Sequence, residues 1–251
     1  MTYKTLLLTM ILGAALGIAS APAFCWQHQH GTEAERAAAA AASAPSPAEL
    51  AKLEADKRFS EFNHRFAGLF VLLLGLLALI ESRLAVRYAF VRYLWALFFF
   101  IPGIYLLFLS DPESWPTGNQ TLYYVITENM QVLQHKIFSI LLLALSVVEY
   151  FRVRHRLRSL WAVALFPALA AAGALLLFVH SPQAHAAGMG AAAHLTMQKV
   201  EHQHIGFAVV GLGIALTKAA TDWGRFHPRW MRNLFAVLMC TLGVLLLLYT
   251  E

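Results

Sequence analysis

Three histidines stand at corresponding places in the 251-residue sequence, each directly after an amide residue and directly before an apolar run. They are His64, His135 and His204, and they lie 71 and 69 residues apart. This weak internal repeat predicts three similar helical units, each with an imidazole at the same depth. Small residues, which let helices pack closely in lipid, follow each histidine by four and by eleven positions: Gly68 and Gly75, Ser139 and Ser146, Ala208 and Ala215.

Other groups that can bind a metal accompany these histidines. Glu61 and Glu201 each precede a repeat histidine by three residues, a spacing that places both side chains on one helix face. The stretch HSPQAHAAGMGAAAHLTMQKVEHQH, residues 180–204, contains five histidines and two methionines. Imidazole with thioether suits copper, whereas imidazole with carboxylate suits zinc or iron. We therefore expect a metal site, with copper favoured, whose candidate ligands are His64, His135, His180, His202, His204, Glu61, Glu201 and Met197.

Six apolar segments are expected to form the helices that position these groups. The chain is 59% hydrophobic and only 13% charged, against about 25% charged residues in ordinary soluble domains. Crossing a bilayer takes about 20 helical residues. The sequence thus predicts an all-α fold for residues 59–251, a polytopic bundle of six transmembrane helices built of three helical hairpins. We place the apolar segments near 62–80, 93–109, 132–151, 160–179, 204–220 and 233–249.

The residues before the bundle differ in composition. Residues 1–23 combine a basic start, an apolar core and a small-x-small end, the pattern of a cleavable signal peptide. Residues 24–58 are rich in alanine and predict a flexible tether with a short helix near its end. The tether would carry a metal-binding arm that contains Cys25, His28 and His30.

Basic residues alternate between the predicted connections. The first, third and fifth contain three, four and three arginines, whereas the second has no Lys or Arg and the fourth has only Lys199. Basic loops stay in the cytoplasm, so we expect a bacterial inner-membrane protein whose mature N- and C-termini are both periplasmic. Nine of the eleven histidines then face the periplasm. In the second connection, Asp111 and Glu113 either approach the metal or cap the next helix.

The net charge of +5 comes from these short clusters and does not indicate a nucleic-acid partner. The expected partner is the lipid bilayer, and a periplasmic metal carrier is a further candidate. A leader, several apolar helices and outer-facing His and Met clusters resemble the copper-resistance D family of bacterial inner-membrane proteins. The resemblance lies in architecture and ligand placement, and it implies copper sequestration or passage across the inner membrane.

Three other functions remain open from the sequence. A b-type haem for membrane electron transfer needs two histidines on different helices at one level, which the repeat can supply. A di-iron site needs two Glu-x-x-His pairs and two further glutamates, and Glu128 offers only one of the latter. A histidine cluster can also sense pH near 6. No nucleophile triad, phosphate loop or dinucleotide fingerprint is visible, and the inner halves of the helices look almost purely apolar, so we expect a binding protein rather than an enzyme or a channel.

Overall fold

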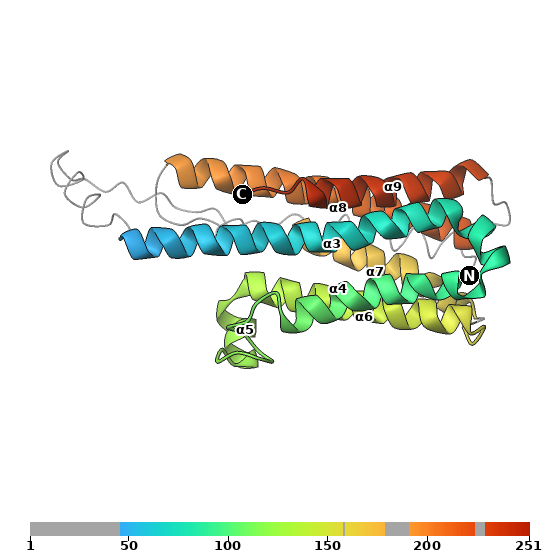
Figure 1. The fold of residues 1–251 in the computed structure, drawn as a ribbon, viewed down its shortest axis with the longest axis horizontal. Helices are drawn as coiled ribbons and strands as arrows, with labels where there is room; N and C mark the ends of the chain where they lie inside the picture. The colour runs from blue at the N-terminus through green and yellow to red at the C-terminus, as the bar shows by residue number, and fades with distance from the viewer. Residues whose placement is uncertain (1–45, 158, 179–190, 224–228) are drawn as a thin grey trace, which may run out of the picture. The chain divides into compact units, whose positions relative to one another are not determined.

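A computed structural model describes residues 46–157, 159–178, 191–223 and 229–251 of the chain (Figure 1). These residues are helical, without a strand, which confirms the all-α prediction for the described part. Five of the helices are long and apolar enough to cross a membrane, and a further apolar helix, Ala162–Phe178, is shorter. Such helices point to a multi-pass membrane protein. The predicted signal peptide and the Cys25/His28/His30 arm lie outside the described residues.

Each predicted apolar segment coincides with a helix of the described residues, to within two residues where the segment runs past the helix end, but two helices begin well before their apolar parts. α3 begins at Pro47 rather than near residue 62, and α8 begins at Ala191 rather than near residue 204. Hydrophobicity marks the part of a helix suited to lipid and not where the helix starts. In chain order the elements are α3 (Pro47–Arg87), the 3-10 helix η1 (Ala89–Tyr93), α4 (Leu94–Phe108), α5 (Leu122–Glu128), α6 (Met130–Val153), α7 (Leu160–Phe178), α8 (Ala191–Trp223) and α9 (Arg229–Leu247).

The start of α3 is fixed by a capping box. The Ser46 hydroxyl accepts from the Glu49 backbone N–H at 3.3 Å, and the Glu49 carboxylate accepts from the Ser46 N–H at 2.6 Å. Pro47 occupies the first helical position, where its missing N–H is not needed. Residues 47–58 are therefore the first turns of a 41-residue helix, continuous with the apolar segment. The boundary between tether and bundle that we predicted at residue 58 falls inside this helix.

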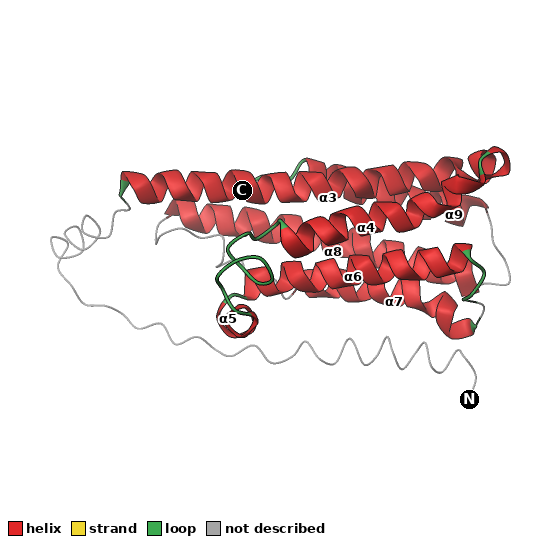
Figure 2. Ribbon diagram, turned by 60° about the horizontal axis from the view of Figure 1, so that its bottom comes forward, coloured by secondary structure: helices red, strands yellow, loops and turns green. Residues whose placement is uncertain are grey.

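The six longest helices of the described residues form a closed ring of contacts in the order α3, α4, α6, α7, α8, α9 and back to α3. Figures 1 and 2 show these helices running along one common direction. The most extensive pairings join each histidine-bearing helix to one neighbour, α3 to α9, α6 to α4 and α8 to α7. The partners within each predicted hairpin are in contact as well, but less extensively. The histidine-bearing helices thus alternate with the other three around the ring.

Small residues of the repeat occupy these close pairings. A Cβ added at Gly75 would lie 2.6 Å from the backbone nitrogen of Cys240, so α3 and α9 approach each other more closely than a larger residue allows. On α6, the hydroxyls of Ser139 and Ser146 each donate a 2.8 Å hydrogen bond to a backbone carbonyl of α4. All six small residues of the repeat are buried, as expected: Gly68, Gly75, Ser139, Ser146, Ala208 and Ala215.

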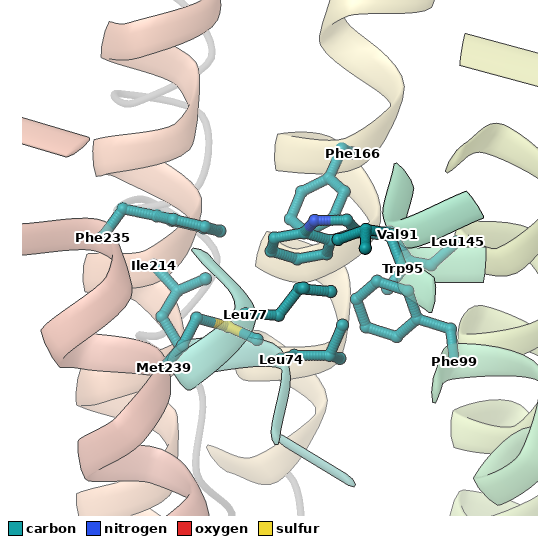
Figure 3. Close-up of a cluster of buried hydrophobic side chains, with 10 residues drawn as sticks. All are labelled: Leu74, Leu77, Val91, Trp95, Phe99, Leu145, Phe166, Ile214, Phe235 and Met239. Carbon is teal, nitrogen blue, oxygen red and sulfur yellow. The ribbon is translucent and has the colours of Figure 1, made fainter. Parts of the chain in front are cut away.

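The bundle has two polar ends. We call the end that contains His64 and Tyr249 the histidine end, and the end that contains Arg92 and Arg152 the arginine end. Basic residues of the first, third and fifth connections line two cavities at the arginine end, so these connections share one side, as the charge pattern predicts. Between the ends, close to the arginine end, lies a core of buried side chains (Figure 3): Leu74, Leu77, Val91, Trp95, Phe99, Leu145, Phe166, Ile214, Phe235 and Met239.

Candidate functional site

Two of the three repeated histidines meet at the histidine end. The ring centroids of His64 on α3 and His204 on α8 lie 5.8 Å apart, with the ring planes at 87°. His204 is 4% exposed and His64 is half-buried. α3 and α8 are not neighbours in the ring, because α9 lies between them. The two imidazoles reach each other beside Tyr249, which follows the end of α9.

Tyr249 fills the space next to this histidine pair. Its ring stacks on His64 with centroids 3.8 Å apart and meets the ring of His204 edge-on at 5.9 Å. The side chain is fully buried, and its hydroxyl donates to the Glu251 carboxylate at 2.9 Å. Burial, together with the nearby carboxylates of Glu251 and Glu61, raises the pKa of the Tyr249 phenol far above its ordinary value. The phenol beside the pair therefore stays neutral at physiological pH.

Glu251, which neighbours Tyr249, is hydrogen-bonded to α3. The Ser60 hydroxyl donates to the Glu251 carboxylate, and the Glu251 backbone N–H donates to the Glu61 carboxylate at 3.2 Å. The other oxygen of Glu61 forms an ion pair with Arg65 at 2.8 Å. Both oxygens of Glu61 are therefore engaged by groups other than His64, although the two residues lie three positions apart.

The amide residues before His64 and His204 tie elements together. Asn63 donates to the Ser110 carbonyl at 3.2 Å and accepts from the Tyr105 hydroxyl at 2.6 Å, which links α3 to α4 and the residues after it. Gln203 exchanges two hydrogen bonds with the backbone of Thr250, at 2.8 and 3.2 Å. These two amides thus hold His64 and His204 at helix junctions.

The third repeated histidine has a different partner. His135 Nδ1 lies 3.2 and 3.3 Å from the two carboxylate oxygens of Asp111, which follows α4. The Lys136 ammonium lies 3.9 Å from the same carboxylate and donates to the Leu107 carbonyl at 2.9 Å. Burial acts to raise the pKa of Asp111, but hydrogen bonds from His135 and Ser110 and the charges of His135 and Lys136 outweigh it, so this pKa lies below its ordinary value. Asp111 orients His135 instead of capping the next helix, where Thr121 is the cap.

Backbone carbonyl oxygens orient both rings of the pair. His64 Nδ1 lies 2.9 Å from the Ser60 carbonyl oxygen, and His204 Nδ1 lies 2.8 Å from the Val200 carbonyl oxygen. A carbonyl oxygen only accepts, so Nδ1 carries a proton in both rings. A hydrogen bond of this kind orients metal-binding histidines in proteins.

The other candidate ligands do not gather around the pair. His202 is exposed and bonds through Nδ1 to the Gln198 carbonyl at 2.7 Å, Glu201 is exposed and Met197 is half-buried. His180 lies outside the described residues. Within the described ranges, no three His, Cys, Asp or Glu side chains converge closely enough to form a metal cluster. Only two of the three imidazoles that we expected to converge meet, and His135 faces Asp111 instead.

The arginine end holds a polar network that sequence reasoning missed. Glu149 pairs with Arg152 at 2.9 Å, Arg152 with Asp222 at 3.2 Å, and Asp222 with Lys218 at 2.8 Å. Glu149 is only 8% exposed. We had expected the inner halves of the helices to be almost purely apolar, and this network shows that the expectation was wrong. The sequence did contain a sign of these ion pairs, because opposite charges lie three residues apart in α6 and four residues apart in α8.

The site thus consists of two imidazole nitrogens from separate helices, beside a neutral phenol, with a carboxylate-bound third histidine on α6. No protein-family model matches this chain, and neither a curated protein nor a solved structure matches it. The resemblance to the copper-resistance D family stays a prediction, and the function is argued from the site itself.

Proposed function

We propose that this chain is a multi-pass inner-membrane protein that binds a metal ion, with copper favoured, through His64 and His204. The observation that carries the proposal is the pair itself, with rings 5.8 Å apart. Both Nδ1 atoms are hydrogen-bonded to backbone carbonyl oxygens, the kind of contact that orients metal-binding histidines in proteins. Two imidazoles on separate helices let one ion hold α3 and α8 together.

Copper is favoured for two reasons. For nitrogen ligands, the affinities of divalent first-row metals rise to a maximum at copper. The second reason is the composition of residues 180–204, in which methionine thioethers, which select Cu(I), accompany the histidines. The supported role is copper handling or resistance, with a periplasmic carrier as the source or recipient of the ion, rather than catalysis.

The orientation in the membrane follows from charge. The arginine end collects the basic connections, and basic loops stay in the cytoplasm. The histidine pair then faces the periplasm, as do the ends of the bundle at Ser46 and Glu251. We take α7 as the sixth crossing helix, although its apolar part is the shortest, because it packs between α6 and α8 in the ring.

A b-type haem is the second candidate, because His64 and His204 lie on two different helices at one level. Bis-histidine ligation would place the porphyrin between the two rings. The rings are in edge-to-face contact, and Tyr249 covers one face of His64, so haem would require the pair to separate. A di-iron site is less favoured, because Glu61 is engaged by Arg65 and Glu251.

A copper titration of the purified, chelator-stripped protein against a competing chromophoric chelator tests the proposal. His64→Ala and His204→Ala each remove one of two donors, so each should weaken copper binding by more than about 100-fold, the upper range for loss of an outer-shell partner. His202→Ala is the matched control, because this exposed residue has the same carbonyl bond on the same helix. We expect it to bind copper like the wild type.

Three results would change the assignment. A strong Soret band with stoichiometric haem in the isolated protein would favour the haem alternative. Copper binding that is unchanged in the His64→Ala/His204→Ala double variant would overturn both the copper and the haem assignment of this pair. A loss in His135→Ala as large as in His204→Ala would make His135 a third ligand. Melting temperatures of all variants serve to confirm that they are folded.

A further inference from the structure

Two cavities adjoin at the arginine end, far from the histidine pair. One, of about 270 Å³, lies among α4, α6, α8 and α9 and reaches the ion pairs of Glu149 and Arg152. The other, of about 690 Å³, lies between the end of α3, η1 and the start of α9. Glu81 and Arg92 line both cavities, so the two lie side by side. The larger volume is in the range of small-molecule sites, about 300–1,000 Å³.

The charges around this site do not balance. Glu149 is paired with Arg152, and Glu81 accepts from the Trp95 indole at 3.0 Å. Lys218 is paired with Asp222. The surplus is positive, because three exposed lining arginines form no ion pair with any residue that the structure describes: Arg83, Arg92 and Arg232.

The larger cavity also has an apolar wall at a defined level. Leu79 and Val86 line it, and they are 45% and 86% exposed. The apolar span of α3 ends at Glu81, and the next span begins at Ala89. The cavity therefore lies where lipid-facing helix surface gives way to polar residues, the level of the phospholipid headgroups.

We propose that this site binds the headgroup of an anionic phospholipid. Arg83, Arg92 and Arg232 hold the phosphate, because a guanidinium binds phosphate oxygens through two parallel hydrogen bonds. Leu79 and Val86 contact the start of the acyl chains. Basic pockets between the cytoplasmic ends of transmembrane helices recognise anionic headgroups. The exposed apolar wall distinguishes a lipid from a free phosphate, which would gain nothing from it, and the site is independent of the metal site at the other end.

Native mass spectrometry of the full chain in micelles of phosphatidylcholine with phosphatidylglycerol measures the binding. Each basic residue near an anionic headgroup contributes about fivefold in affinity, so Arg92→Gln should reduce phosphatidylglycerol retention about fivefold. The triple variant R83Q/R92Q/R232Q should reduce it about a hundredfold if the contributions add. Arg87→Gln is the matched control, because Arg87 is an exposed arginine of the same helix end that lines neither cavity.

Arg92→Lys separates charge from geometry, since lysine keeps the charge without the paired hydrogen bonds, and we expect intermediate retention. Equal retention in the triple variant and in Arg87→Gln would overturn the proposal. Titration of inorganic phosphate in pure phosphatidylcholine micelles is the second arm, and no arginine-dependent binding is expected. Phosphate binding that the triple variant loses would assign the cavities to a soluble anion and overturn the lipid source. Arg92→Gln alone decides the question if the triple variant does not fold.

Discussion

The two ends of the bundle accommodate buried polar groups in different ways. At the histidine end, His64 and His204 are satisfied by backbone carbonyls, and a neutral Tyr249 packs against both rings. At the arginine end, a chain of full charges runs from Glu149 to Lys218, and open cavities are lined by arginines that form no ion pair with the described residues. One end is tightly filled by aromatic rings, whereas the other is open and charged.

The difference follows from what it costs to bury each kind of group. An unpaired buried ion costs several kcal/mol, so the charges of Glu149 and Asp222 come with partner cations. A neutral imidazole whose Nδ1–H is satisfied needs no counter-ion and still offers a lone pair. Imidazole rings can therefore be buried at the histidine end without counter-ions. At the arginine end, only the charges that remain after internal ion pairing can bind a ligand.

Arg152→Met should have the largest effect, because it removes the cation shared by Glu149 and Asp222 and leaves Glu149 buried without it. Removing one partner of a buried pair destabilises by about 3–5 kcal/mol. Arg152 is partly accessible, so we expect about 3 kcal/mol, measured as a lower melting temperature in detergent. Arg154→Met, the same change at an exposed residue two positions on, should stay within about 0.5 kcal/mol of the wild type. Similar melting temperatures for both variants would contradict the charged network.

Gly75→Ala should have an intermediate effect and should reach both ends, because the two ends share the interface between α3 and α9. The added Cβ would lie 2.6 Å from the Cys240 nitrogen. Overpacking of this kind costs about 1–3 kcal/mol. Gly206→Ala is the control, since a Cβ there meets nothing within 4 Å and alanine gains up to about 1 kcal/mol in helix propensity. If Gly75→Ala raised the melting temperature as much as Gly206→Ala, α3 and α9 would not approach so closely.

Tyr249→Phe should have the smallest effect, and it depends on pH. Below pH 10 the variant should be less stable by about 1 kcal/mol, because it loses the hydrogen bond to Glu251. The folded-state pKa of Tyr249 is raised above its unfolded-state value of about 10. The stability that the Tyr249 phenol contributes is therefore complete below pH 10. It falls as the pH rises above 10, because the phenol then ionises only in the unfolded state.

The melting temperatures of wild type and Tyr249→Phe should therefore converge as the pH increases from 9 to 11. Tyr123→Phe, at a residue 77% exposed, should show no such convergence. A constant difference between wild type and Tyr249→Phe across this range would mean that the Tyr249 ring is accessible to water, and the closed packing of the histidine end would be wrong.

The sequence predicted the histidine repeat and the buried small residues because both recur at fixed positions in similar helices. It could not identify Tyr249 as the neighbour of His64 and His204. That contact depends on the closure of the ring, which brings the last helix between the first and the fifth apolar segments. Asp111 was noticed, but two roles were left open, since the approach of α4 to α6 fixes which one applies.

The network at the arginine end escaped prediction for a related reason. Glu149, Arg152, Lys218 and Asp222 each resemble a solvated charge near the end of an apolar helix. Only the packing of α6 near α8 turns them into a buried chain of ion pairs. Hydropathy likewise located the apolar part of α3 but gave no sign of its first turns, whose capping box is visible in the letters S-P-A-E at residues 46–49.

The length of α3 makes it a spacer as well as part of the bundle. Its 41 residues correspond to about 61 Å, roughly twice the thickness of a hydrocarbon core of about 30 Å. His64 lies seventeen positions after Pro47, so the helix start stands about 26 Å from the histidine pair along its axis. A ligand that binds the exposed first turns of α3 therefore stands about 26 Å from the histidine pair, because an intact helix sets that separation.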